Sequence, residues 1–107
     1  MEPNAPTLAL LGADFYLPAE APTMTEAELV DWLARAVDQL MQDRPDYLRS
    51  LCYTLDIDEA AVAAALHPAA PEPPNRGLAR LLYARQWRRA RSKQTIPAPP
   101  LDDEDAW

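Results

Sequence analysis

The sequence has little of what secreted, metal-binding and nucleotide-binding proteins are made from. A single cysteine, Cys52, excludes an intramolecular disulfide and a thiolate cage around a metal ion. A single histidine, His67, excludes a histidine pair, so we expect no metal site and no cofactor. Two glycines in 107 residues are too few for a glycine-rich loop around phosphates. No nucleophile, base and orienting group can be assembled, so we expect no catalytic residues and no enzymatic activity.

β-Branched apolar residues and long apolar runs are also scarce. Valine and isoleucine together number five, against 20 alanines and 15 leucines, and this choice favours an all-α fold. No apolar run approaches the roughly 20 residues that cross a bilayer. The first residues lack the positive charge of a secretory signal, and arginine is absent before Arg35. We therefore expect a cytoplasmic protein without a membrane partner.

Two helices are predicted in the first half of the chain. Thr25 and Glu28 have the spacing of a capping box, and apolar residues then recur at helical spacing, which predicts a helix over residues 26–42. Asp43, with a proline two residues later, has the pattern of an acidic N-cap followed by a first turn that needs no amide donor. This pattern predicts a second helix near residues 44–54.

Two more helices are predicted in the second half. Asp58 is placed as the N-cap of a short alanine-rich helix over residues 59–66. Four prolines make residues 67–75 a stiff connector. Asn75 is then placed to cap a last helix over roughly residues 76–92.

These elements predict a small bundle of three to four helices with extended, proline-containing arms at both ends. The helical domain comprises residues 24–93, and the acidic C-terminal tail comprises residues 94–107. Residues 1–23 contain four prolines around an apolar patch, and we expect an extended arm there. Packing of this arm against its own helices is the first interpretation, and binding to a partner is the second.

The cysteine and the histidine have structural interpretations. Cys52 falls on the apolar face of its predicted helix, which favours a buried and inert thiol. His67 follows the last turn of a predicted helix, where a histidine interacts favourably with the helix dipole. Residues 47–66 have a helix–turn–helix arrangement, but the second helix has no side chain that reads base edges. We therefore expect these two helices to serve as structural scaffold and not to bind DNA.

Charge is strongly segregated along the chain. Residues 1–75 carry thirteen acids and three arginines, whereas residues 76–93 carry six arginines, one lysine and no acid. Residues 94–107 carry four further acids, and the net charge is −7. The overall sign argues against a dedicated binder of DNA or of anionic membranes, because such binding needs a positive potential.

The basic run is the main candidate binding site. Its partner-binding residues are Arg85, Trp87, Arg88, Arg89, Arg91 and Lys93. We expect this run to face the acidic helices of its own chain or an acidic protein, or to offset the negative end of its own helix dipole. RNA is the alternative, since arginines grip phosphates and an aromatic ring stacks on bases, and anionic lipid is a third.

The acidic tail is the second candidate. It contributes Asp102, Asp103, Glu104, Asp105 and Trp107. This end is similar to the C-terminal tip of bacterial single-stranded DNA-binding proteins, in which a run of aspartates precedes an apolar end. The resemblance implies docking of a partner protein through a basic, partly hydrophobic pocket. It covers six residues, the last four depart from the family, and nothing else in the chain looks like that family's OB-fold. A solubilising tail is the alternative.

Together these features predict a non-enzymatic protein–protein interaction protein: an adaptor, assembly factor or accessory subunit. It would use its terminal arms and the basic helix. A small RNA-binding regulator that acts through the arginine-rich helix, residues 76–93, is the alternative. A core of about 70 residues is only marginally stable alone, so a homo-oligomer or a larger complex is compatible with this reading.

Overall fold

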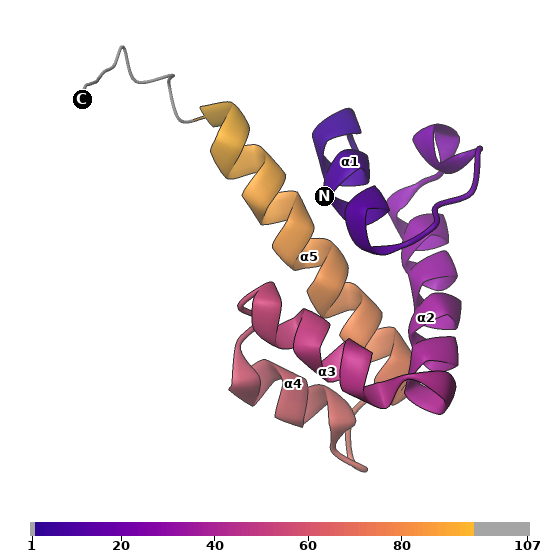
Figure 1. The fold of residues 1–107 in the computed structure, drawn as a ribbon, viewed down its shortest axis with the longest axis vertical. Helices are drawn as coiled ribbons and strands as arrows, with labels where there is room; N and C mark the ends of the chain where they lie inside the picture. The colour runs from indigo at the N-terminus through magenta and orange to yellow at the C-terminus, as the bar shows by residue number, and fades with distance from the viewer. Residues whose placement is uncertain (1, 96–107) are drawn as a thin grey trace.

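The computed structural model describes residues 2–95, and this part of the chain consists of helices and their connecting turns, without a strand (Figure 1). Its helices are α1 (Ala5–Asp14), α2 (Glu26–Asp43), α3 (Pro45–Thr54), α4 (Glu59–Leu66) and α5 (Pro74–Thr95), with a 3₁₀ turn, η1 (Ala21–Thr23), before α2. Helix α5 runs diagonally across the molecule and contacts α1, α2 and α4. The all-α prediction is confirmed for the described residues, which form five helices where three to four were predicted.

The prediction of an extended N-terminal arm is wrong, because residues 5–14 form a helix. The Asn4 side chain caps it: Oδ1 accepts hydrogen bonds from Thr7 N at 2.9 Å and from Thr7 Oγ1 at 2.7 Å. Pro6 lies in the first turn, where its missing amide donor costs nothing. Leu11 and Phe15 are buried in the core. The segment therefore packs against its own helices, as the first interpretation had it.

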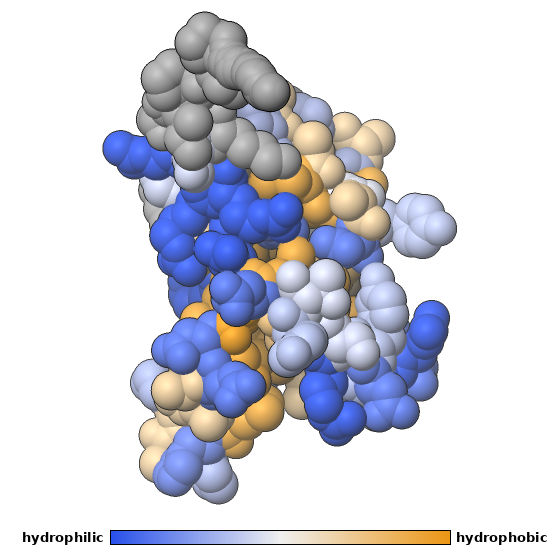
Figure 2. Space-filling model, turned by 60° about the vertical axis from the view of Figure 1, so that its left-hand side comes forward, coloured by the Kyte–Doolittle hydropathy of each residue, from blue (hydrophilic) through white to orange (hydrophobic). Residues whose placement is uncertain are grey.

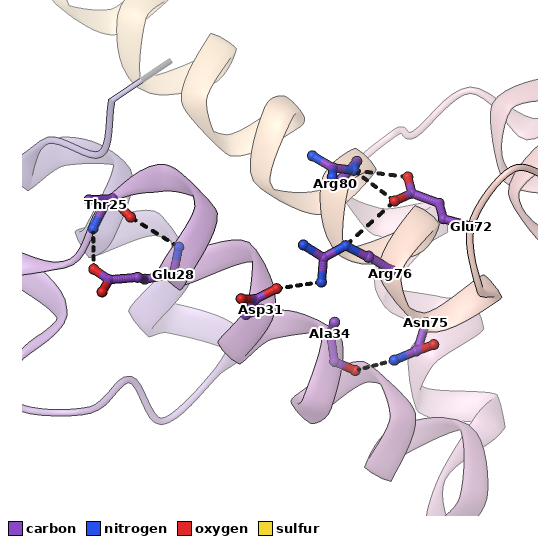
Figure 3. Close-up of polar contacts among 8 residues, drawn as sticks. All are labelled: Thr25, Glu28, Asp31, Ala34, Glu72, Asn75, Arg76 and Arg80. Carbon is purple, nitrogen blue, oxygen red and sulfur yellow. Dashed lines mark hydrogen bonds and ion pairs between the residues drawn. The ribbon is translucent and has the colours of Figure 1, made fainter.

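Helix α2 begins where its capping box predicts. Thr25 Oγ1 accepts from Glu28 N at 3.2 Å, and Glu28 Oε1 accepts from Thr25 N at 2.9 Å (Figure 3). Satisfying these two orphan donors fixes the first turn. The buried face of α2 forms the centre of the core and consists of Leu29, Val30, Leu33, Ala34 and Val37.

The junctions around α3 and α4 are partly as predicted. Asp43 belongs to the last turn of α2, and Arg44 occupies the N-cap position of α3 without a side-chain capping bond, so the prediction of Asp43 as N-cap is wrong. Asp58 does cap α4, because its Oδ1 accepts from Ala60 N at 3.3 Å. Between α3 and α4 the chain turns at Asp56, whose φ of 58° lies in the left-handed region that aspartate tolerates.

Helix α5 begins earlier than predicted, at Pro74. Proline suits the first turn of a helix because the amide hydrogen that it lacks would have no partner there. The predicted cap, Asn75, has another role: its Nδ2 donates to Ala34 O at 3.1 Å and ties α5 to α2 (Figure 3). Two residues on, a Cβ placed on Gly77 would lie 3.1 Å from the Cβ of Ala65. The glycine therefore allows α4 to pack closely against α5.

The core is built from α1, α2, α3 and α5, with α5 packed against α1 and α2, and α3 packed against α2. It contains apolar side chains from all four of these helices, including the fully buried Leu11, Leu33 and Leu82. Helix α4 contributes no buried residue and covers α5 from outside. Among residues 2–95, no helix has both the length and the apolar composition that crossing a membrane requires.

Candidate interaction surface on helix α5

The arginines in the first half of α5 are neutralised by acids of the same chain (Figure 3). Arg76 Nη1 bonds to Asp31 of α2, and Arg76 Nε lies 3.6 Å from Glu72 Oε1. Arg80 Nε donates to Glu72 Oε2 at 2.9 Å. For these two arginines, pairing with the chain's own acids accounts for the positive charge, and little of it remains for a partner.

Arg85 begins the second half and has a structural role. Its Nε donates to the carbonyl oxygen of Leu55 at 2.8 Å, and the side chain is half-buried. Leu55 is the C-cap of α3, where a cation interacts favourably with the negative end of the helix dipole. This contact ties the end of α3 to α5, and it joins residues 30 positions apart in the sequence.

Arg89 is oriented by a buried glutamine. Its Nη1 donates to Gln86 Oε1 at 2.8 Å, and Gln86 is only 1% exposed. Gln86 was not predicted as a site residue from the sequence. Its position, four residues after the buried Leu82 and four before the buried Ala90, is the signal that places it on the inner face of α5.

The second half of α5 presents a hollow without acidic lining. Arg85, Arg88, Arg89 and Ser92 surround this hollow, which has a volume of about 400 Å³. Arg85 and Arg89 bond to uncharged oxygens, and Arg88 is exposed between them. Three arginines therefore line one hollow, and no carboxylate is among its lining residues. We call these four residues the basic surface.

Trp87 lies beside this surface and points toward the N-terminal segment. Its Nε1 donates to the carbonyl oxygen of Glu2 at 3.1 Å, and the half-buried ring packs against the core. The guanidinium of Arg91 lies 5.3 Å from the ring centroid, in a cation–π contact. The ring thus holds the two ends of the described fold together, and Arg91 covers one of its faces.

The remaining predicted site residues lie outside what the structure describes. They are the side chain of Lys93 and the tail residues Asp102, Asp103, Glu104, Asp105 and Trp107. Their roles stay predictions.

Cys52 lies in the interior of the fold, whereas His67 lies at its surface. Cys52 is buried, and burial raises the pKa of its thiol above its ordinary value, which makes the reactive thiolate rarer. His67 is the exposed C-cap of α4, and its Nδ1 accepts from Ala69 N at 2.9 Å. Within residues 2–95, no three metal-ligating side chains gather at one place.

Similarity to known proteins adds no functional residue to this surface. No protein-family model, curated protein or solved structure matches this chain.

Proposed function

We propose that this chain is a non-enzymatic protein–protein interaction protein, an adaptor, assembly factor or accessory subunit, that binds an acidic partner through the basic surface of α5. One observation carries the proposal: Arg85, Arg88 and Arg89 line a hollow that has no acidic lining residue. In the first half of the same helix, Arg76 and Arg80 are ion-paired within the chain. The positive charge that the fold leaves for a partner is therefore concentrated in the second half.

The basic surface is suited to carboxylates. A guanidinium presents several donors in a planar fork that matches a carboxylate. The hydrogen bonds from Arg85 to Leu55 O and from Arg89 to Gln86 Oε1 hold two of the forks in place before a partner arrives. Such pre-orientation reduces the side-chain entropy lost on binding.

RNA has less support than a protein partner. Stacking on bases would need an accessible aromatic ring beside the arginines, but the Trp87 ring packs on the core and lies under Arg91. The net charge of −7 also repels a polyanion. We expect a mixed-sequence single-stranded RNA to bind feebly at physiological salt, as measured by fluorescence anisotropy at two salt concentrations. Tight binding that weakens steeply with salt would favour the RNA-binding regulator.

The proposal is tested by affinity capture from native lysate with the full chain, with and without nuclease. We expect protein partners that survive nuclease treatment and are lost when Arg88→Gln and Arg89→Gln are combined. The control combines Arg35→Gln and Arg44→Gln, which makes the same charge change at exposed positions on α2 and at its end. Partners lost equally from both variants, or lost on nuclease treatment, would contradict the proposal.

A further inference from the structure

An apolar groove runs between helices α3 and α4. Two adjoining hollows, of about 640 and 280 Å³, share Cys52 and Val62 in their lining and so form one depression. At one end, by the α3–α4 turn, Ile57 joins the lining. At the other end the lining includes Met41 and Leu78.

The walls of this groove hold large apolar side chains that the fold leaves exposed. Tyr53 on α3 is 82% exposed, and Leu66 on α4 is 47% exposed. Helix α4 is mostly alanine and has no buried residue, so it forms a low wall. Figure 2 shows hydrophobic residues in a strip down the middle of one face of the molecule, bordered by hydrophilic residues. Exposed apolar groups that line a depression are typical of docking sites.

The charge along the groove is uneven. Asp56, Asp58 and Glu59 gather at the α3–α4 turn, and all three are exposed. Arg49 also lines the groove, but its Nη1 lies 3.1 Å from Asp46 Oδ1 in an ion pair. The turn end of the groove therefore carries net negative charge, while the opposite end is mainly apolar.

We propose that this groove docks an amphipathic helix of a partner protein, with the apolar stripe of that helix in the groove and Lys or Arg at the end that lies over the α3–α4 turn. Helix α3 has ten residues and is about 15 Å long, which matches roughly three turns of a docked helix. Helices commonly dock in this way, through apolar residues at i, i+3, i+4 and i+7. The site is separate from the basic surface and does not depend on the proposed function.

Charge and packing favour this occupant over two others. The chain's own residues 96–107 carry four acids, which would meet the acidic turn with like charge. The basic helix α5 of a second copy has its apolar face already covered by α1 and α2. A separate helix with one basic end has neither obstacle.

The test is a selection of displayed helical peptides of about 14 residues, roughly 20 Å as a helix, against the full chain. We expect enriched peptides to combine an apolar stripe with a basic end. Combining Tyr53→Ala with Leu66→Ala should weaken their binding by about tenfold or more, because both side chains form the groove walls. The control, Tyr16→Ala, removes a 100% exposed tyrosine outside the groove and should change the affinity less than about twofold.

A second pair of variants tests the acidic end. Combining Asp56→Asn with Glu59→Gln should weaken the binding of the same peptides by about three- to fivefold. Asparagine tolerates the positive φ at residue 56, so the turn should keep its conformation. Combining Glu20→Gln with Asp38→Asn removes two exposed acids elsewhere and should change the affinity less than about twofold.

Four results would overturn the proposal. The first is a selection that enriches no peptide or enriches peptides without a basic end. The second is an equal loss of affinity in the control variants. The third is a dimer that Tyr53→Ala and Leu66→Ala convert to monomer in sedimentation velocity, which would assign the groove to a second copy. The fourth is a gain in peptide affinity when Ile96→Ser and Leu101→Ser are combined, which would assign it to the chain's own last residues.

Discussion

At the scale of single residues, Tyr83 couples the stability of the fold to alkaline pH. Its side chain lies in α5 and is only 1% exposed. Burial raises the pKa of its hydroxyl well above the ordinary value, and the nearby carboxylates of Glu26 and Glu2 raise it further. The folded protein therefore keeps this proton at pH values where the unfolded chain releases it.

Replacing Tyr83 should change the pH dependence of unfolding above pH 10. Because the pKa is raised on folding, the contribution of Tyr83 is complete below about pH 10, the unfolded pKa, and is lost as the pH rises above it. In Tyr83→Phe, the fall in unfolding free energy with pH should be shallower by up to about 1.4 kcal/mol per pH unit. Urea unfolding between about pH 9 and pH 11 measures this. Tyr16→Phe, at a fully exposed tyrosine, should keep the wild-type slope, and equal slopes in all three proteins would contradict the prediction.

Leu33 is the residue whose truncation should be most informative about the core. It lies in the buried face of α2 and is 0% exposed. Leu33→Ala should reduce the free energy of unfolding by about 2–5 kcal/mol, because it removes buried methyl groups and leaves a cavity. Leu66→Ala, at a half-exposed leucine, should cost no more than about 1 kcal/mol. Chemical unfolding followed by far-ultraviolet circular dichroism gives both values, and a near-zero cost for Leu33→Ala would mean that α2 is not packed in a core.

At the scale of the elements, local capping chemistry predicts the starts of two of the five described helices. The Thr25–Glu28 capping box and the Asp58 cap depend on side chains within three residues, so sequence alone predicts α2 and α4 well. The helix α1 was not predicted, because its prolines indicated an extended arm. Asn4 with Pro6 is nevertheless a cap followed by a first-turn proline, the pattern that predicted a helix near residues 44–54.

The candidate site was predicted in composition but not in role. A run of arginines identifies α5 as basic, and it does not show which guanidinium groups serve the fold. Arg85 bonds to a carbonyl 30 residues away, and Arg76 bonds to Asp31 in another helix. Such contacts depend on how the helices cross. The groove between α3 and α4 depends on packing in the same way and has no signature in the sequence.

The contact between α4 and α5 should show coupling between Gly77 and Ala65. Alanine favours a helix over glycine by about 1 kcal/mol, but a Cβ at position 77 would meet the Cβ of Ala65 at 3.1 Å. Gly77→Ala should therefore stabilise the protein less in the wild-type background than in an Ala65→Gly background. Unfolding free energies of the four proteins form a double-mutant cycle. Additive effects would mean that the two helices adjust without cost.

At the scale of the whole molecule, charge is divided between a basic half-helix and acidic segments. The tail acids, Asp102–Asp105, follow α5 in the sequence, and residues 95–101 can span at most about 25 Å. That length suffices for the tail acids to reach the basic surface. We expect the tail to compete with an acidic partner for this surface, through exposed pairs of about 0–1 kcal/mol each that salt weakens.

Removing the tail should expose this competition. Deletion of residues 102–107 should raise the affinity for heparin by more than its loss of four negative charges explains. The control neutralises four acids elsewhere, with Glu2→Gln, Asp14→Asn, Glu20→Gln and Asp38→Asn combined. Affinity is measured by calorimetry at low and physiological salt. Equal gains in both variants would mean that only net charge matters.

The central position of α5 also has a consequence for synthesis. Helices α1 and α2 bury their apolar faces largely against α5, and the Trp87 ring bonds to the backbone at Glu2. A ribosome makes α5 after every other described helix, so Leu11 and the apolar face of α2 have no complete partner surface while translation proceeds. We therefore expect the chain to complete its core only after α5 has left the exit tunnel, and its apolar segments to stay without their packing partners until then.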